Sequence, residues 1–319
     1  MSCIYRGAVI DTDLSKNARG GTEMMRERLL SAVPESVLDN FAIHFSRPRQ
    51  VYDDVKNIFY AHDLASDPEN KILLDDGWKL FEKFVFVSYW QRDQYMIMYG
   101  IPYSKCTVIE NAIETEFEYA ERPNDGPIRF VYHTTPHRGL ELLYPIFDGL
   151  SKEFDNIHLD VFSSFEIYGW KERDKQYYEL FERLKNHPKI TYHGTKPNEE
   201  VIAALKQSHI FLYPCIWQET SCIAMIEAIR CGCLVIHPSL AALPETASNV
   251  TVMYDFNENH AMHANAAYKL ARNILMLENK DRGFINSYAA DTGRETFKNS
   301  ITTYKTKWVG LLEQLSRPK

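Results

Sequence analysis

Residues 217–236 read "WQETSCIAMIEAIRCGCLVI" and combine the signals of a loop, a short helix and a buried strand. Thr220 and Ser221 have side chains that can cap a helix, and Gly232 can end one. The apolar run "CLVI" predicts a strand. We therefore expect a helix that begins near Ser221 and leads into a strand, an order typical of a parallel sheet covered by helices.

Two glutamates accompany this helix, Glu219 just before it and Glu227 inside it. The first backbone N–H groups of a helix have no partner within it and carry partial positive charge, so they attract an anion or a hydroxyl-rich ligand. Glu227 would lie about two turns beyond Glu219, at about 1.5 Å per residue. The pair could therefore contact two parts of one elongated ligand, although solvated glutamates on a helix surface give the same pattern.

Strand and helix patterns alternate on both sides of this stretch. In the N-terminal part, strands are predicted at "CIYRGAVI", "FAIHFS", "NIFYAHD", "KFVFVSYW" and "CTVIENA", and helices at Thr22 to Val33, near Trp78 to Glu82, and at Gln91 to Tyr99. In the C-terminal part, strands are predicted at "IRFVYHT", "HLDVFSS", "ITYHG", "IFLYP" and "CLVIHP", and further helices at Leu140 to Lys152, Asp174 to Leu184 and Asn198 to Gln207. Strands separated by helices predict an α/β fold with parallel sheets.

The stretch "EYAERPNDGPIRF" interrupts this alternation with charges, prolines and a glycine, which is the composition of a linker. We expect two Rossmann-like, doubly wound domains that face a cleft, at residues 1–120 and 128–295, joined by a linker at 121–127. Residues 296–319 should form a C-terminal helix that crosses back to the N-terminal domain. This helix has an apolar stripe of Trp308, Val309, Leu311, Leu312 and Leu315.

Composition narrows the class of protein. The chain has 319 residues, 45% of them hydrophobic, and a formal net charge of −7, which disfavours a general nucleic-acid coat. We find no apolar run of 18 residues and no signal peptide, so we expect a cytoplasmic protein without a transmembrane segment. Cys231 and Cys233, one residue apart, match none of the common zinc frameworks, and we expect no metal site and buried thiols at all six cysteines.

In doubly wound sheets, ligands bind beyond the carboxyl ends of the strands. At the first of these ends, the segment "NARGGTE" (Asn17 to Glu23) places Gly20, Gly21 and Thr22 at the start of a predicted helix, where two glycines allow a phosphate or sugar to approach the backbone. It lacks the dinucleotide-binding and P-loop patterns, and a plain turn would give the same residues.

Polar side chains follow one apolar strand in each half of the chain. "YAHDLASDP" places His62 and Asp63 after a strand, and His62 could hydrogen-bond a ligand hydroxyl or be a structural histidine. "YHTTPHRG" places Arg138 after another strand and before Gly139, which permits close backbone approach. Arginine suits bidentate contact with phosphate oxygens, whereas the alternative is a solvated loop arginine.

Together these motifs resemble the retaining GT-B glycosyltransferases of the family 4 type, also called glycosyl transferases group 1. The most specific match is "ETSCIAMIEA", which is similar to the family's signature of two glutamates separated by seven residues. Four further matches follow the family's order along the chain. They are "GGTE", the "HD" at His62 and Asp63, "FVSYWQRDQYMIMYGIPYSKCTVIENAIE" and "YHGTKPNEEV".

The resemblance implies roles for individual residues. Glu219, helped by the backbone of Thr220 to Ile223, would hold sugar hydroxyls, and Glu227 would hold the ribose of a nucleotide sugar. The family has an Arg and a Lys beside the donor diphosphate, and here those positions are His133 and Arg138. The implied catalytic residues are His62, Arg138 and Glu219. The implied donor-binding residues are Gly20, Gly21, Thr22, His133, Arg138, Gly194, Glu219, Thr220, Ser221, Cys222, Ile223 and Glu227.

The resemblance also implies the reaction, which is metal-independent transfer of a sugar, with retention, from a nucleoside diphosphate sugar to an acceptor hydroxyl. We expect a UDP-sugar as donor and substrate, with no separate cofactor. A glycan is our first expectation for the acceptor, and a hydroxylated base in DNA is the second. A sugar nucleotide epimerase and a non-catalytic module that binds nucleotide sugars remain alternatives.

Overall fold

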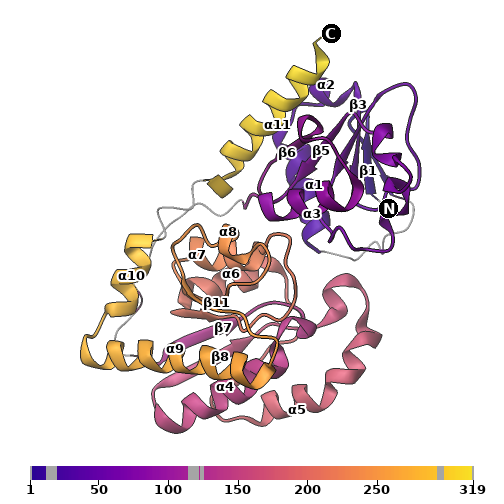
Figure 1. Cartoon of the computed structure of the whole chain (residues 1–319). Helices are drawn as coiled ribbons and strands as arrows, with labels where there is room; N and C mark the ends of the chain where they lie inside the picture. Colours follow the sequence, from indigo (N-terminus) through magenta and orange to yellow (C-terminus); the bar gives the residue numbers. More distant parts are fainter. Residues whose placement is uncertain (1, 12–19, 114–121, 123–125, 293–297, 318–319) are drawn as a thin grey trace. The chain divides into compact units, whose positions relative to one another are not determined.

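The structure is a computed structural model that describes residues 2–11, 20–113, 122, 126–292 and 298–317. The chain divides into two compact units. Unit 1 comprises Met1–Glu114, Glu219–Ser221 and Phe297–Lys319, and unit 2 comprises Thr115–Gln218 and Cys222–Thr296. Each unit is built on a six-stranded sheet, and helices of both units are labelled in Figure 1. None of the helices in the described ranges combines the length and the apolar character needed to span a bilayer.

The sheet of unit 1 is mixed and has the strand order β2-β1-β3-β4-β5-β6. Its strands are β1 (Ser2–Tyr5), β2 (Ala8–Asp11), β3 (Phe41–Phe45), β4 (Lys56–Tyr60), β5 (Lys83–Phe86) and β6 (Cys106–Val108). From β3 to β6 neighbouring strands run parallel, and β1 pairs antiparallel with both β2 and β3. The prediction of one strand at "CIYRGAVI" is wrong. Arg6 and Gly7 both have positive φ, 49° and 78°, which makes this segment a tight two-residue hairpin.

The α-helices of unit 1 are α1 (Gly21–Ala32), α2 (Glu35–Leu38), α3 (Tyr89–Tyr99) and α11 (Ile301–Ser316). The helix expected near Trp78 to Glu82 is a single 3-10 turn, η2 (Gly77–Leu80), because Asp76 before it has positive φ and β5 begins at Lys83. Trp308 of α11 is fully buried, with its ring centroid 4.9 Å from that of Tyr60. The stripe on α11 therefore packs inside unit 1.

The sheet of unit 2 is entirely parallel and has the order β12-β11-β10-β7-β8-β9. Its strands are β7 (Ile128–Tyr132), β8 (Ile157–Val161), β9 (Ile190–Tyr192), β10 (Ile210–Leu212), β11 (Leu234–Pro238) and β12 (Val252–Tyr254). Strands β7 to β9 extend the sheet in one direction and β10 to β12 in the other. The order therefore reverses between β7 and β10, the place where ligands of doubly wound sheets bind.

Helices cover both faces of this parallel sheet. They are α4 (Leu140–Glu153), α5 (Tyr178–Asn186), α6 (Asn198–Gln207), α7 (Ile223–Arg230), α8 (Leu243–Thr246), α9 (His260–Lys280) and α10 (Phe284–Thr292). Figure 1 shows α6 and α7 on one side of the strands and α4 and α9 on the other. The helix predicted from Asp174 begins as a 3-10 segment, η6 (Lys171–Tyr177), and becomes α-helical at Tyr178. The predicted α/β class with two Rossmann-like units is confirmed.

Candidate functional site

The segments that follow β7 and β10 are in direct contact at the switch point of unit 2. Gly139, after β7, has φ of 120°, and a Cβ atom there would lie 2.2 Å from the carbonyl oxygen of Pro214, after β10. We expected Gly139 to let a ligand approach the backbone. The structure shows instead that it makes room for the Pro214 carbonyl, so this glycine holds the two segments together.

His133 lies between β7 and the start of α7. Its ring centroid is 4.9 Å from that of Phe211, and it forms a hydrogen bond with the backbone of Ala224. Burial, only partly offset by that bond, lowers the pKa of His133 to about 4. The imidazole is therefore neutral near pH 7, and it cannot supply the positive charge that the family's arginine has at this position.

Arg138 is the last residue of the 3-10 turn η4 (Pro136–Arg138). Its Nη1 donates to Thr135 Oγ1 in the same turn and to the hydroxyl of Tyr168, 3.5 Å away. Tyr168 ends η5 (Phe165–Tyr168), which follows β8. The guanidinium is therefore held between two strand ends at the carboxyl edge of the sheet.

Several buried polar atoms at this edge have no hydrogen-bond partner within the protein. Native structures rarely leave such atoms unpaired, so a cluster of them points to a ligand. The described atoms of this kind at the ends of β7 and β9 are His133 Nε2, Thr134 Oγ1, His137 Nδ1 and Thr195 Oγ1.

Sequence reasoning did not single out three of these four residues, Thr134, His137 and Thr195. The available signal was a run of polar residues directly after an apolar strand. Burial, together with the positive charges of Arg138 and Arg173, lowers the pKa of His137 to about 3.

Helix α7 begins at Ile223, two residues later than predicted. Its N-cap is Cys222, which makes no side-chain capping bond, and its first backbone bond joins Ile226 N to Cys222 O at 3.1 Å. Thr220, the predicted cap, donates its hydroxyl to the carbonyl of His62 at 2.8 Å and belongs with unit 1. The first turn of α7 therefore has no side-chain cap to compete with a ligand for its N–H groups.

Both glutamates of the signature are buried. Glu219 is 8% exposed and Glu227 is 4% exposed, so the alternative of two solvated glutamates is wrong. Glu227 Oε1 accepts a hydrogen bond of 3.2 Å from Asn198 Nδ2, at the start of α6. Gly194, four residues before Asn198, has φ of 67° and open space where a side chain would be. The structure thus links Glu227 to the segment after β9, and Asn198 was not predicted.

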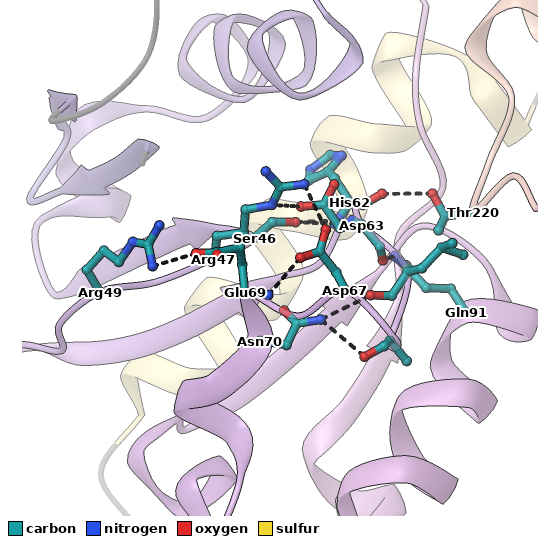
Figure 2. A network of polar contacts seen from close by, with 12 residues as sticks. Ser46, Arg47, Arg49, His62, Asp63, Asp67, Glu69, Asn70, Gln91 and Thr220 are labelled. Carbon is teal, nitrogen blue, oxygen red and sulfur yellow. Dashed lines mark hydrogen bonds and ion pairs between the residues drawn. The ribbon is translucent and has the colours of Figure 1, made fainter. Parts of the chain in front are cut away.

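Unit 1 has its own polar group at a strand end, shown in Figure 2. The backbone N–H of His62, two residues after β4, donates to Ser46 Oγ at 2.7 Å. The His62 ring stacks on Phe45, with centroids 5.8 Å apart, and meets the edge of Tyr60 at 4.2 Å. Burial lowers the pKa of His62 to about 3, and its Nε2 has no hydrogen-bond partner in the protein. His62 is therefore a neutral imidazole with one unpaired ring nitrogen.

Asp63, next to His62, is held by an arginine that sequence reasoning missed. Arg47 Nε lies 2.9 Å from Asp63 Oδ2, and Arg47 Nη2 lies 2.8 Å from Asp67 Oδ2. Burial nevertheless raises the pKa of Asp63 above its ordinary value, against the attraction of Arg47. The ion pairs therefore compensate part of the cost of burying the carboxylate.

The predicted glycine loop opens α1. Gly20 is buried and is the N-cap in an extended conformation, without a side-chain capping bond, and Gly21 and Thr22 are the first helical residues. Asn17 to Arg19 lie outside the described residues. Among the residues that the structure describes, no cluster of three or more His, Cys, Asp or Glu is arranged to hold a metal ion.

Comparison with known proteins identifies similar sequences. Residues 112–275, just over half of the chain, match the family model described as glycosyl transferases group 1. The chain is 26% identical over 192 residues to a phosphatidylinositol N-acetylglucosaminyltransferase subunit of Homo sapiens, which is 59% of this chain and 38% of that protein. The chain spans about two fifths of the length of the curated relatives that it matches.

Solved structures share the fold over most of the chain. A glycosyltransferase of Rickettsia africae matches with a TM-score of 0.66 and 18% identity, over 97% of this chain and 85% of that one. The HepE protein of Anabaena in complex with UDP-glucose matches with a TM-score of 0.61 and 13% identity, over 91% of this chain and 77% of that one. These likenesses confirm the predicted GT-B fold.

Proposed function

Because this chain belongs to the family of glycosyl transferases group 1, we propose that it transfers a sugar from a nucleoside diphosphate sugar to an acceptor hydroxyl, with retention at the anomeric carbon. One observation carries the proposal. At the switch point of unit 2, the uncapped start of α7, the held guanidinium of Arg138 and the buried Glu227 accompany four buried polar atoms that have no protein partner. A ligand with a diphosphate and several hydroxyls fits these groups.

The residues of unit 2 suit distinct parts of the donor. We assign the ribose to Glu227, because a buried carboxylate accepts hydrogen bonds from paired hydroxyls. We assign the diphosphate to Arg138 and to the first N–H groups of α7. Gly194, with open space beside it, lets the donor reach the backbone after β9. His133 and Thr134 face the same ligand with neutral groups.

The reaction needs stabilisation of the charge that develops on the departing diphosphate. Preorganised donors aimed at that charge lower the barrier, and they act strongly where water is excluded. Arg138 supplies a full positive charge, and the start of α7 supplies a partial one. These groups require no metal ion. In unit 1, Glu219 holds sugar hydroxyls, and the unpaired Nε2 of His62 forms a hydrogen bond with a substrate hydroxyl.

The names of similar proteins guide the choice of substrates. We propose a UDP-sugar as donor, and UDP-N-acetylglucosamine is the first to test because the curated relatives are N-acetylglucosaminyltransferase subunits. For the acceptor we propose a glycan, in keeping with the acidic balance of the chain, whose formal net charge is −7.

A substrate screen tests the proposed function. The full chain is incubated with UDP-N-acetylglucosamine, UDP-glucose and other nucleoside diphosphate sugars, with oligosaccharides, phosphatidylinositol or hydroxymethylated DNA as acceptors, and the products are identified by mass spectrometry. We expect release of UDP and transfer to a glycan, and NMR should show the anomeric configuration of the donor in the product. An altered sugar nucleotide formed without acceptor would establish the epimerase instead. A donor that binds but never reacts would establish the binding module, and transfer to DNA alone would replace the glycan.

A further inference from the structure

We propose that Ser46 and Arg47 are positioning residues that fix the orientation of the His62 imidazole for its substrate. This inference rests on the proposed function of His62. All the residues involved belong to unit 1, and Figure 2 shows how they lie around the end of β4. Neither Ser46 nor Arg47 belongs to a motif of the glycosyltransferase signature. Their backbone conformation and their contacts indicate the role.

Ser46 and Arg47 are two consecutive residues in the left-handed region, with φ of 52° and 36°. For residues other than glycine this conformation costs roughly 1–2 kcal/mol each, and it persists only where the surroundings enforce it. Glycine would adopt it with less strain but has no oxygen to accept a hydrogen bond. A strained serine at this place therefore suggests that its hydroxyl is needed.

The Ser46 hydroxyl sets the direction in which the chain leaves β4. Its Oγ accepts hydrogen bonds from the backbone N–H groups of His62 and Asp63, at 2.7 and 3.2 Å, while Ser46 N donates to Tyr60 O at 2.8 Å. These three bonds join the end of β3 to the turn that carries His62. With the backbone fixed, the His62 ring is held between Phe45 and Tyr60, and its unpaired Nε2 keeps one direction.

Arg47 fixes the same turn from its other side. Its two ion pairs bind Asp63 and Asp67, and Asp67 Oδ1 in turn accepts from Glu69 N at 2.8 Å. The carbonyl of Asp63 accepts from Gln91 Nε2 at 2.8 Å. The residue after His62 is thus held through both its side chain and its backbone, which is more restraint than a surface loop requires.

Kinetics of matched variants test the proposal. Ser46→Gly removes the hydroxyl and relieves the strain, so the protein should remain folded while kcat falls about 10- to 100-fold, because small misplacements of a reacting group cost that much. Arg47→Ala should lower kcat in the same direction. The matched controls are Ser300→Gly, which removes a serine that accepts from Thr303 N at 3.2 Å, and Arg49→Ala, which removes a 2.6 Å ion pair with Glu69. Both controls should keep the parental kcat.

A double-mutant cycle separates positioning from general support of the fold. If Ser46 acts through His62, Ser46→Gly should have no further effect on kcat in a His62→Ala background. Additive losses would show that Ser46 supports the fold and would overturn the proposal. An unchanged kcat in Ser46→Gly would overturn it as well.

A measurement without turnover keeps this inference distinct from the proposed function. NMR titration of the imidazole signals of the full chain should show His62 neutral down to a pKa of about 3, with no change in Arg49→Ala. In Ser46→Gly the ring should leave its site between Phe45 and Tyr60 and titrate closer to 6.5, the ordinary pKa of histidine. A chain without transferase activity that still shows this contrast would refute the proposed function but keep the positioning. Identical His62 titrations in parent and Ser46→Gly would refute the positioning.

Discussion

Arg138 supplies positive charge at the carboxyl edge of the second sheet, where burial keeps His133 neutral. We predict that Arg138→Ala lowers kcat at saturating donor by about 10²–10³, the usual loss when one donor to developing charge is removed. Arg138→Lys should retain part of the activity, because the charge remains without the bidentate fork. His133→Ala should lose less than Arg138→Ala.

Steady-state kinetics on folded variants check this prediction, with thermal melting as the test of folding. Arg183→Ala is the matched control, since Arg183 stacks over Tyr144 at 4.1 Å and has no proposed role in the reaction. A folded Arg138→Ala enzyme with full activity would mean that the diphosphate is held elsewhere.

At single residues, the sequence indicated the chemistry better than the geometry. Glu219 and Glu227 could be selected because their spacing is specific, and both are buried. Ser46 and Arg47 could not be selected, because their importance depends on a positive φ that only the fold imposes. Likewise, the unpaired atoms of Thr134 and Thr195 are significant only because the surrounding structure buries them. The sequence alone reveals neither property.

At the scale of elements, the contact between the segments after β7 and β10 depends on Gly139. We predict that Gly139→Ala lowers the free energy of unfolding by more than about 3 kcal/mol, because the new Cβ would meet the Pro214 carbonyl at 2.2 Å in a backbone conformation that alanine rarely adopts. Gly194→Ala, with φ of 67° but open space around the new Cβ, should cost only about 1–2 kcal/mol. Urea unfolding of both variants gives the comparison, and equal losses would contradict the proposed role of Gly139.

The junction between β10 and β7 predicts a pH dependence of stability. His209 Nδ1 accepts from Arg129 N at 3.1 Å, and His209 N donates to Arg129 O at 2.8 Å, so the imidazole extends the pairing of the two strands. Burial, with the charges of Arg122 and Arg129, lowers the pKa of His209 from 6.5 to about 4. The unfolded chain therefore binds more protons between pH 6.5 and 4. The stabilisation is complete above pH 6.5 and is lost as the pH falls through this window, by up to about 1.4 kcal/mol per pH unit.

His209→Asn tests that sign, because asparagine keeps an acceptor near Arg129 N but does not titrate. We expect the free energy of unfolding of the variant to fall less steeply than that of the parent between pH 6.5 and 4. Denaturant unfolding at several pH values measures both slopes. Parallel slopes would show that His209 is protonated equally in the folded and unfolded chain.

Elements themselves were predicted well where the apolar period was long and poorly where a turn was short. Helix α6 was predicted at its observed bounds, since its pattern is complete between Pro197 and Ser208. The hairpin at Arg6 and Gly7 was missed because only two residues separate its strands, and the apolar pattern continues through them. The start of α7 was misplaced because the Thr220 hydroxyl bonds to His62, a partner distant in sequence.

At the scale of the whole molecule, the alternating pattern predicted two α/β units but not what each surface covers. The apolar stripe on α11 identified the face that packs, and only the structure shows that Trp308 lies against Tyr60 in unit 1. The family match at residues 112–275 falls largely on unit 2, which carries the switch point and Glu227. The proposed function therefore depends most on nucleotide binding by unit 2.

Calorimetric titration of UDP into the full chain and into Glu227→Ala tests this central claim most directly. A buried carboxylate that accepts hydrogen bonds from ribose hydroxyls is worth about 1.5–3 kcal/mol, so the variant should bind UDP roughly 10- to 100-fold more weakly than the parent, with no change in its fold by circular dichroism. Glu245→Ala, in α8 of the same unit, is the matched control and should bind UDP like the parent. Equal affinity of Glu227→Ala and parent for UDP, or no binding of any nucleoside diphosphate by the folded parent, would contradict the account.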